Sequence, residues 1–119
     1  MQRMRIVGAL VAGATVLAGA TACGEDPKAS TDEPVVVEIT FADGTVEPNG
    51  ERVDVAAGQP IDLVVTADEP GSLHIHSESE QEFAFEAGTE TFPIRIDRPG
   101  VVEVESHELD QVIVQLEVR

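Results

Sequence analysis

The feature that most constrains the fold is a period-two alternation of apolar and polar residues, which runs through nearly all of residues 35–119. Successive side chains of a β-strand point to opposite faces, so this period is typical of strands with one face in a core. About eight segments of strand length show the pattern: 35–41, 52–55, 61–65, 72–76, 82–85, 89–96, 101–105 and 112–118. No window of about eleven or more residues in this region carries the 3.6-residue period of a capped amphipathic helix.

Turn-forming residues separate these segments. Glycine, proline, asparagine and aspartate favour tight turns, because they adopt or enforce the backbone angles that turns need. They cluster at residues 43–44, 49–50, 58–60, 69–71, 87–88 and 97–100. Short strands joined by regular turns predict an all-β fold, a Greek-key antiparallel β-sandwich of about seven to eight strands. Pro93 lies inside the sixth segment and has no N–H for a ladder, so we expect an edge strand or a bulge there.

Residues 35–119 predict one domain, because 85 residues leave no room for a second core. The chain has a single cysteine and neither tryptophan nor tyrosine. The domain therefore has to fold without a disulfide, on valine, isoleucine, leucine and phenylalanine side chains. The four phenylalanines fall at alternating strand positions and are expected in the core: Phe41, Phe83, Phe85 and Phe92.

The first 22 residues resemble a bacterial lipoprotein signal peptide. Arg3 and Arg5 precede an uncharged apolar run of 15 residues at 6–20, and small residues at 20–22 lead into Cys23. The run is shorter than the ~20 apolar residues that cross a bilayer, so a permanent transmembrane helix is the poorer interpretation.

Cys23 is expected to carry the lipid, since a lone free thiol outside the cytoplasm is prone to oxidation. Ordinary cleavage at the small residues is the alternative, and it would yield a secreted protein with a free thiol. Residues 24–34 hold no large apolar side chain and predict a flexible tether. The expected organisation is a signal peptide at 1–22, a lipidated cysteine and tether at 23–34, and a folded domain at 35–119 on the extracytoplasmic face of the cell membrane.

The charge of the chain limits its partners. It has seven basic and 23 acidic residues, and the loss of Arg3 and Arg5 with the signal peptide leaves a net charge of about −18. Such a surface excludes nucleic acid as a partner, because phosphate binding needs a basic surface. It also disfavours contact between the domain and anionic headgroups, so we expect membrane attachment through the lipid alone. An envelope protein is the other candidate partner.

The second half of the domain resembles the ligand-loop hairpin of the cupredoxins. The resemblance rests on residues 88–92, on residues 99–107 and on the closing strand at 112–118. Upstream, residues 57–65 and 73–76 are similar to the strand pair in which that family keeps its first histidine ligand. The chain looks most like the cupredoxin-like domains of actinobacterial surface lipoproteins and of periplasmic iron-uptake proteins, which implies a cupredoxin-like sandwich over 35–119.

The same resemblance implies a site that lacks the blue-copper ligands. A blue-copper centre uses two histidines, a cysteine thiolate and a weak axial methionine. The family's cysteine falls on Ser106, its second histidine on Leu109 and its axial methionine near Val112. A serine hydroxyl does not supply the charge-donating sulfur, so blue-copper electron transfer is not expected.

Three histidines offer a different ligand set. His74 and His76 are two residues apart on a predicted strand, so their side chains share a face with bases about 6.6 Å apart. Both can then reach one ion at ~2.0 to 2.1 Å. His107 would supply a third nitrogen. In an extended chain it points away from Ser106, so we expect its use as a ligand to require a turn of the loop.

A carboxylate from Glu78, Glu80 or Glu108 is the expected fourth ligand. Imidazole suits copper, zinc and nickel, and Cu(II) binds most tightly to a given nitrogen site. In the alternative interpretation, His74 and His76 lie on the solvent face without specific partners. Nitrogens that converge within about 4 Å of one another would favour the metal site.

These patterns predict a binding protein rather than an enzyme. Glutamates that alternate along a strand are usually its wet face, and Ser106 lacks the glycine-flanked turn of a serine nucleophile. We therefore expect a lipid-anchored cupredoxin-like domain whose divergent site at His74, His76 and His107 binds copper or another divalent transition metal. The alternative is a metal-free structural or protein-interaction lipoprotein domain.

Overall fold

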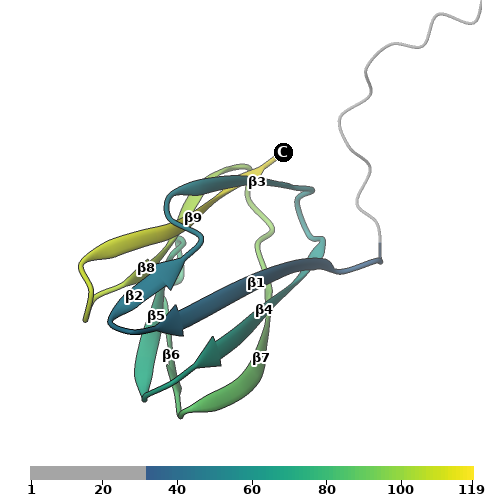
Figure 1. The fold of residues 1–119 in the computed structure, drawn as a ribbon. Coiled ribbons are helices and arrows are strands. Elements are labelled where there is room, and N and C mark those ends of the chain that lie inside the picture. The colour runs from purple at the N-terminus through teal and green to yellow at the C-terminus, as the bar shows by residue number, and fades with distance from the viewer. Residues whose placement is uncertain (1–31) are drawn as a thin grey trace, which may run out of the picture.

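The computed structural model describes residues 32–119, which form two packed β-sheets (Figure 1). The expected signal peptide at 1–22, Cys23 and most of the tether at 23–34 lie outside the described residues. Among residues 32–119 there is no helix of the length and apolarity that a membrane crossing needs. The prediction of an all-β sandwich is confirmed.

The first sheet has four strands in the order β2-β1-β4-β7. They are β1 (Val35–Ala42), β2 (Thr45–Glu47), β4 (Pro60–Ala67) and β7 (Gly88–Arg95). Pro93 lies on β7, which is an edge strand, and its side chain is exposed. The expectation of an edge at Pro93 is therefore confirmed, for the reason that an edge strand tolerates a missing donor.

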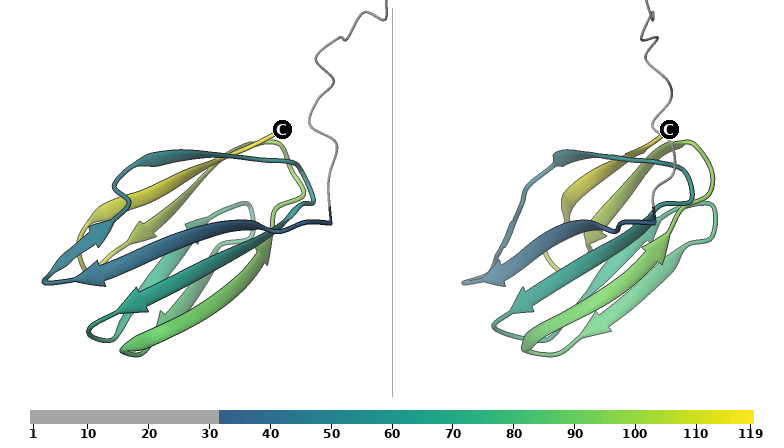
Figure 2. Two further views of the ribbon diagram at one scale, coloured as in Figure 1. Left: turned by 45° about the vertical axis from the view of Figure 1, so that its right-hand side comes forward. Right: turned by 90° about the vertical axis from the view of Figure 1, so that its right-hand side faces the viewer.

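The second sheet has five strands in the order β3-β9-β8-β5-β6. They are β3 (Glu51–Val55), β5 (Gly71–His76), β6 (Gln81–Phe85), β8 (Gly100–Ser106) and β9 (Gln111–Val118). Figure 2 shows this sheet as a separate layer behind β1, β4 and β7. Its central strands β8 and β5 are the ones that position the candidate site.

The sheets are mixed, which corrects the prediction of a purely antiparallel sandwich. β1 pairs with β4 in parallel, with Val35 opposite Ile61, and β3 pairs with β9 in parallel, with Glu51 opposite Val114. The chain passes from one sheet to the other after β2, β3, β4, β6 and β7. Because of these passages, paired strands are often not consecutive in the chain. No tight turn joins such a pair, so the two strands can run parallel.

Nine strands form instead of the seven to eight expected, because β2 has no period-two signal of its own. Only Val46 of its three residues is buried. β2 exists because Asp43 and Gly44 both adopt positive φ, 53° and 73°, and form a two-residue turn after β1. Turns of this kind match the twist of a hairpin and favour Asp-Gly.

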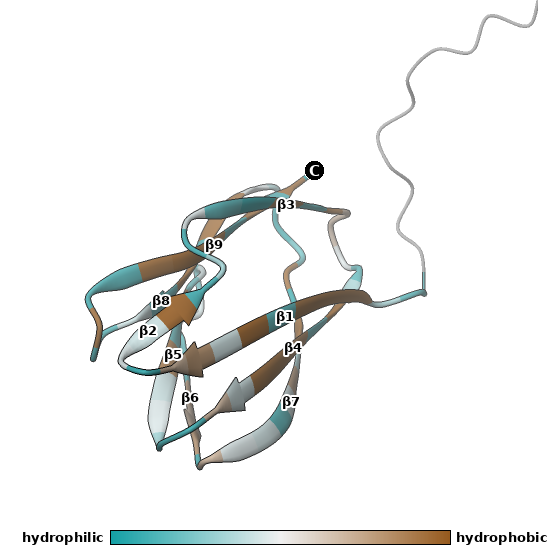
Figure 3. Cartoon of the chain, in the orientation of Figure 1, coloured by the Kyte–Doolittle hydropathy of each residue, from teal (hydrophilic) through white to brown (hydrophobic). Residues whose placement is uncertain are grey.

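The core lies between the two sheets and is built from the inward-facing positions of the strands. Ile61, Leu63, Leu73, Ile75 and Leu116 are fully buried. The alternation of brown and teal along the strands in Figure 3 follows this arrangement. Of the four phenylalanines expected in the core, three are buried, whereas Phe83 is partly buried and stacks on Phe92 with ring centroids 5.1 Å apart.

Candidate metal centre

Strand β5 presents two histidines on the outer face of the five-stranded sheet. Leu73 and Ile75 point into the core and are completely buried. By alternation, His74 and His76 point outward, and their side chains are 18% and 34% exposed. This much agrees with the alternative interpretation, in which the histidines lie on the solvent face. The further expectation of that interpretation, that they have no specific partners, is wrong.

His107 reaches the same face from the end of β8. Ser106 is fully buried, while Glu105 before it and His107 after it both point outward and lie 3.3 Å apart (Oε1 to Nδ1). Since His74 and His76 also face outward, simple alternation brings His107 to them. His107 begins the turn at residues 107–110, so the expected turn of the loop is present, and His107 meets the histidine pair on the face opposite to Ser106.

The three imidazoles converge. One ligand nitrogen from each of His74, His76 and His107 lies within 4.8 Å of the other two. Ring centroids are 4.2 Å apart for His74 and His76 and 4.6 Å apart for His74 and His107. His74 Nδ1 and His107 Nε2 face one another as hydrogen-bond partners. Donors bound to one ion at tetrahedral angles are about 3.3 Å apart, so the cluster is somewhat wider than a bound set and wider than the 4 Å expected.

Two carboxylates flank the imidazoles. Glu80 Oε2 lies 3.8 Å from His74 Nε2, and Glu80 Oε1 lies 3.8 Å from His76 Nδ1. Glu105 contacts His76 Nε2 at 3.1 Å through Oε2 and His107 Nδ1 at 3.3 Å through Oε1. Glu80 was among the expected fourth ligands, whereas Glu105 was not, because glutamates that alternate along a strand usually form its wet face. The missing signal was the pairing of β5 with β8, which places Glu105 opposite His74.

The other two carboxylates named as candidate ligands lie elsewhere. Glu78 forms an ion pair with Arg98 at 2.9 Å. Glu108 accepts a hydrogen bond from the Ser72 hydroxyl at 2.7 Å and one from Ser106 at 3.4 Å. Neither is oriented toward the histidines by these contacts.

The pKa of Glu108 is lowered by its surroundings. Partial burial on its own raises the pKa of this carboxyl. The hydrogen bonds from Ser72, from its own backbone N–H and from Ser106, together with the electrostatic influence of His107, outweigh burial and bring the net pKa below the ordinary value. Glu108 is thus an ionised carboxylate that ties the end of β8 to the start of β5.

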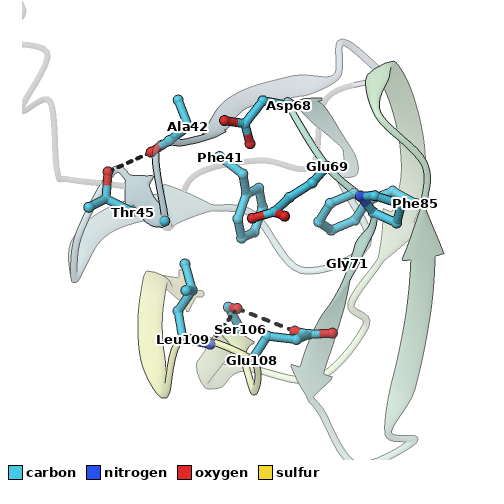
Figure 4. A pocket seen from close by; sticks show the side chains of 12 residues that line it. Phe41, Ala42, Thr45, Asp68, Glu69, Gly71, Phe85, Ser106, Glu108 and Leu109 are labelled. Carbon is cyan, nitrogen blue, oxygen red and sulfur yellow. Dashed lines mark hydrogen bonds between the residues drawn. The ribbon is translucent and has the colours of Figure 1, made fainter.

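The positions that the resemblance assigned to the cysteine and the second histidine, Ser106 and Leu109, lie at one end of the sandwich. Ser106 and Leu109 line a small cavity of about 50 Å³ there, together with Phe41 and Phe85 (Figure 4). The Ser106 hydroxyl accepts the Leu109 N–H at 3.3 Å. Val112 is partly buried on β9. These hydroxyl and hydrocarbon groups do not offer the donor set that copper prefers.

Comparison with known proteins supports the architecture. No protein-family model matches the sequence, and a search of curated proteins gives no match. Among solved structures, the chain is similar to the Cu(I) form of an amicyanin variant with a methionine-to-alanine substitution. The identity is 12% and the TM-score 0.53, and the match covers 76% of this chain and 87% of that chain. An oxidized amicyanin variant with a methionine-to-lysine substitution gives the same identity, TM-score and coverage. The domain therefore has a cupredoxin-like fold.

Proposed function

We propose that the chain is a lipid-anchored extracytoplasmic protein that binds a divalent transition metal, copper first, through His74, His76 and His107. The observation that carries this proposal is that all the histidines of the chain, three in number, meet on one face of the sheet with nitrogens within 4.8 Å. Strand β5 and the turn after β8, about thirty residues apart in the sequence, contribute to the cluster.

The chemistry of the cluster favours copper, zinc or nickel. Imidazole nitrogen is a good ligand for all three ions, and at a given nitrogen site Cu(II) binds most tightly. Glu80 and Glu105 add negative charge at 3.1 to 3.8 Å from the imidazole nitrogens. A divalent cation bound here would be neutralised as well as ligated.

The exposure of the cluster favours capture and release of an ion over electron transfer. Side-chain exposure rises from 18% at His74 to 34% at His76 and 53% at His107, so an ion has direct access from solvent. Ser106 stands where the resemblance marks the thiolate, and a hydroxyl does not tune a copper potential as sulfur does. We infer a role in binding or buffering the metal at the cell surface.

The location at the membrane rests on the sequence. The charged start, the apolar run at 6–20 and Cys23 resemble a lipoprotein signal. The net acidic charge of the remaining chain concentrates cations near the protein, which suits a metal-binding role outside the cell.

Thermal unfolding of the purified protein, produced without a histidine tag, tests the metal site. With free Cu(II) at about 100 times its dissociation constant, the folded state gains about 2.7 kcal/mol, which for a domain of this size raises Tm by about 10 °C or more. His74→Ala and His76→Ala are expected to lose most of this gain. Glu38→Gln, an exposed carboxylate on the other sheet, is the matched control and keeps it.

The result can contradict the proposal in two ways. If the unmutated protein shows no shift with Cu(II) or Zn(II), the metal-free interaction domain becomes the better interpretation. If all variants shift equally, the ion binds elsewhere on the acidic surface rather than at the histidines.

A further inference from the structure

We propose that the two carboxylates beside the histidines have different roles: Glu105 orients His76 and His107 from behind, and Glu80 enters the coordination sphere as the fourth ligand. This inference rests on the proposed function, since it assigns the parts of the same site. Glu105 is then a positioning residue and Glu80 a metal ligand.

Each oxygen of Glu105 holds a different imidazole. Oε2 lies 3.1 Å from His76 Nε2, and Oε1 lies 3.3 Å from His107 Nδ1. An ionised carboxylate only accepts hydrogen bonds, so both of these nitrogens must carry protons. In the neutral imidazoles the lone pairs are left on His76 Nδ1 and His107 Nε2.

The two nitrogens with lone pairs lie on the sides of the rings away from Glu105. His107 Nε2 is hydrogen-bonded to His74 Nδ1, a contact that a bound ion would replace, and His76 Nδ1 lies 3.8 Å from Glu80 Oε1. The two nitrogens of one imidazole direct their lone pairs away from each other. An ion held by His76 Nδ1 and His107 Nε2 therefore lies on the far side of these rings from Glu105. On the near side, the Glu105 carboxylate fixes the tautomers and makes the imidazoles more basic.

Glu80 is in the right place to bind the ion itself. Glu80 Oε2 lies 3.8 Å from His74 Nε2, and Glu80 Oε1 lies 3.8 Å from His76 Nδ1. Both distances are close to the separation of about 3.3 Å between donors on one tetrahedral ion. Glu80 belongs to the segment between β5 and β6, and its side chain is 67% exposed. The Glu105 side chain is only 19% exposed on the central strand β8.

This difference in burial gives the two carboxylates different freedom to move. Glu105 is held by the β8 ladder, with His74 opposite it on β5 and Val112 opposite it on β9. Glu80 can swing by side-chain rotation to admit or release an ion. Three neutral imidazoles with the two carboxylates also balance the two charges of the metal, as a partly buried ion requires.

Zinc and NMR of the protein with ¹⁵N-labelled histidine test the assignment, because imidazole nitrogen shifts report which nitrogen carries a proton or a metal. We expect Zn(II) on His107 Nε2 and His76 Nδ1. Glu105→Gln should lower zinc affinity about 10- to 100-fold and disturb the tautomers of the metal-free protein. Glu80→Gln should lower affinity and leave those tautomers unchanged. Glu78→Gln, whose carboxylate pairs with Arg98, is the matched control and should bind as the unmutated protein does.

The outcomes separate this inference from the proposed function. Absence of zinc binding by the unmutated protein would remove both. Normal binding with the metal on His107 Nδ1, or with Glu105→Gln unaffected, would overturn the assignment of Glu105 and leave the histidine site standing. Thermal unfolding of each metal-free variant shows that the substituted proteins are folded.

Discussion

Glu108 links protonation to folding at the scale of a single residue. Its carboxylate accepts hydrogen bonds from Ser72 on β5 and from Ser106 on β8. Burial opposes its ionisation, but the hydrogen bonds and the electrostatic influence of His107 together outweigh burial and lower its pKa. A carboxyl whose pKa is lower in the folded state stabilises that state above the unfolded pKa and loses the effect as pH falls through the folded pKa.

Glu108→Gln is therefore expected to reduce stability only where the carboxyl is ionised. Above the ordinary glutamate pKa of about 4.3, the free energy of unfolding should fall by a few tenths to about 1 kcal/mol, because the side chain is largely exposed. The difference should vanish as pH drops through the lowered folded-state pKa. Urea unfolding with a chelator present, at neutral and acidic pH, measures it. A constant difference at every pH would contradict the assignment, and Glu90→Gln on the exposed face of β7 serves as control.

Ser106 supports the loop after β8 through its hydroxyl. It lies fully buried at the end of β8, at the position where the resemblance marks a cysteine. Its hydroxyl accepts the Leu109 N–H at 3.3 Å and donates to Glu108 at 3.4 Å. The position that the resemblance assigns to a thiolate ligand thus holds a hydroxyl that supports the loop after β8. The histidines lie on the other face of the sheet.

At the scale of elements, the β1–β2 hairpin depends on its turn rather than on packing. A Cβ at Gly44 would meet nothing within 4 Å, yet its φ is 73°. We expect Gly44→Ala to lower the free energy of unfolding by about 1 to 2 kcal/mol through backbone strain alone. Asp43→Asn keeps a residue type that tolerates positive φ and should change stability little. Denaturant unfolding compares the two, and equal stability of Gly44→Ala and the unmutated protein would exclude strain as the basis of the turn.

The pairing of β5 with β8 creates the candidate site. It places His74 opposite Glu105 and His76 opposite Glu103, so that one outer face carries all four side chains. A shift of one residue in this register would exchange the inward and outward sides of a strand. The burial of Leu73 and Ile75 opposes such a shift, so the core holds the histidines in register.

At the scale of the whole molecule, a small acidic domain needs a separate means of attachment to a membrane. The chain has 23 acidic and seven basic residues, and anionic headgroups repel such a surface. One lipid-modified cysteine would supply the attachment without altering the domain. In the proposed function, attachment and metal binding would depend on separate parts of the chain.

Cys23→Ser is expected to release the protein from the membrane fraction of cells into the soluble extracytoplasmic fraction, because serine has no thiol to accept the lipid. Fractionation and immunoblotting measure the distribution. Ser30→Ala, in the predicted tether, is the control and should stay with the membrane. Retention of Cys23→Ser at the membrane would show that lipidation is not the anchor.

The strands show how much of the fold the sequence pattern predicts. Eight of the nine strands coincide with the predicted segments to within a residue or two, because a strand with one buried face repeats locally every two residues. The short strand β2 has too few residues to show a period. The parallel pairs β1–β4 and β3–β9 escaped prediction because local alternation contains no information on the direction of a distant neighbour.

The sequence by itself determined the alternation that makes this an all-β domain, the choice of an edge or a bulge at Pro93, and the three histidines available as ligands. Tertiary structure decided which face those histidines share and which carboxylates accompany them. Glu105 lies in the cluster because β8 pairs with β5, whereas Glu108, one residue after His107, accepts a hydrogen bond from Ser72. Periodicity is a property of the local backbone, while a ligand set depends on contacts between segments about thirty residues apart, such as the pairing of β5 with β8.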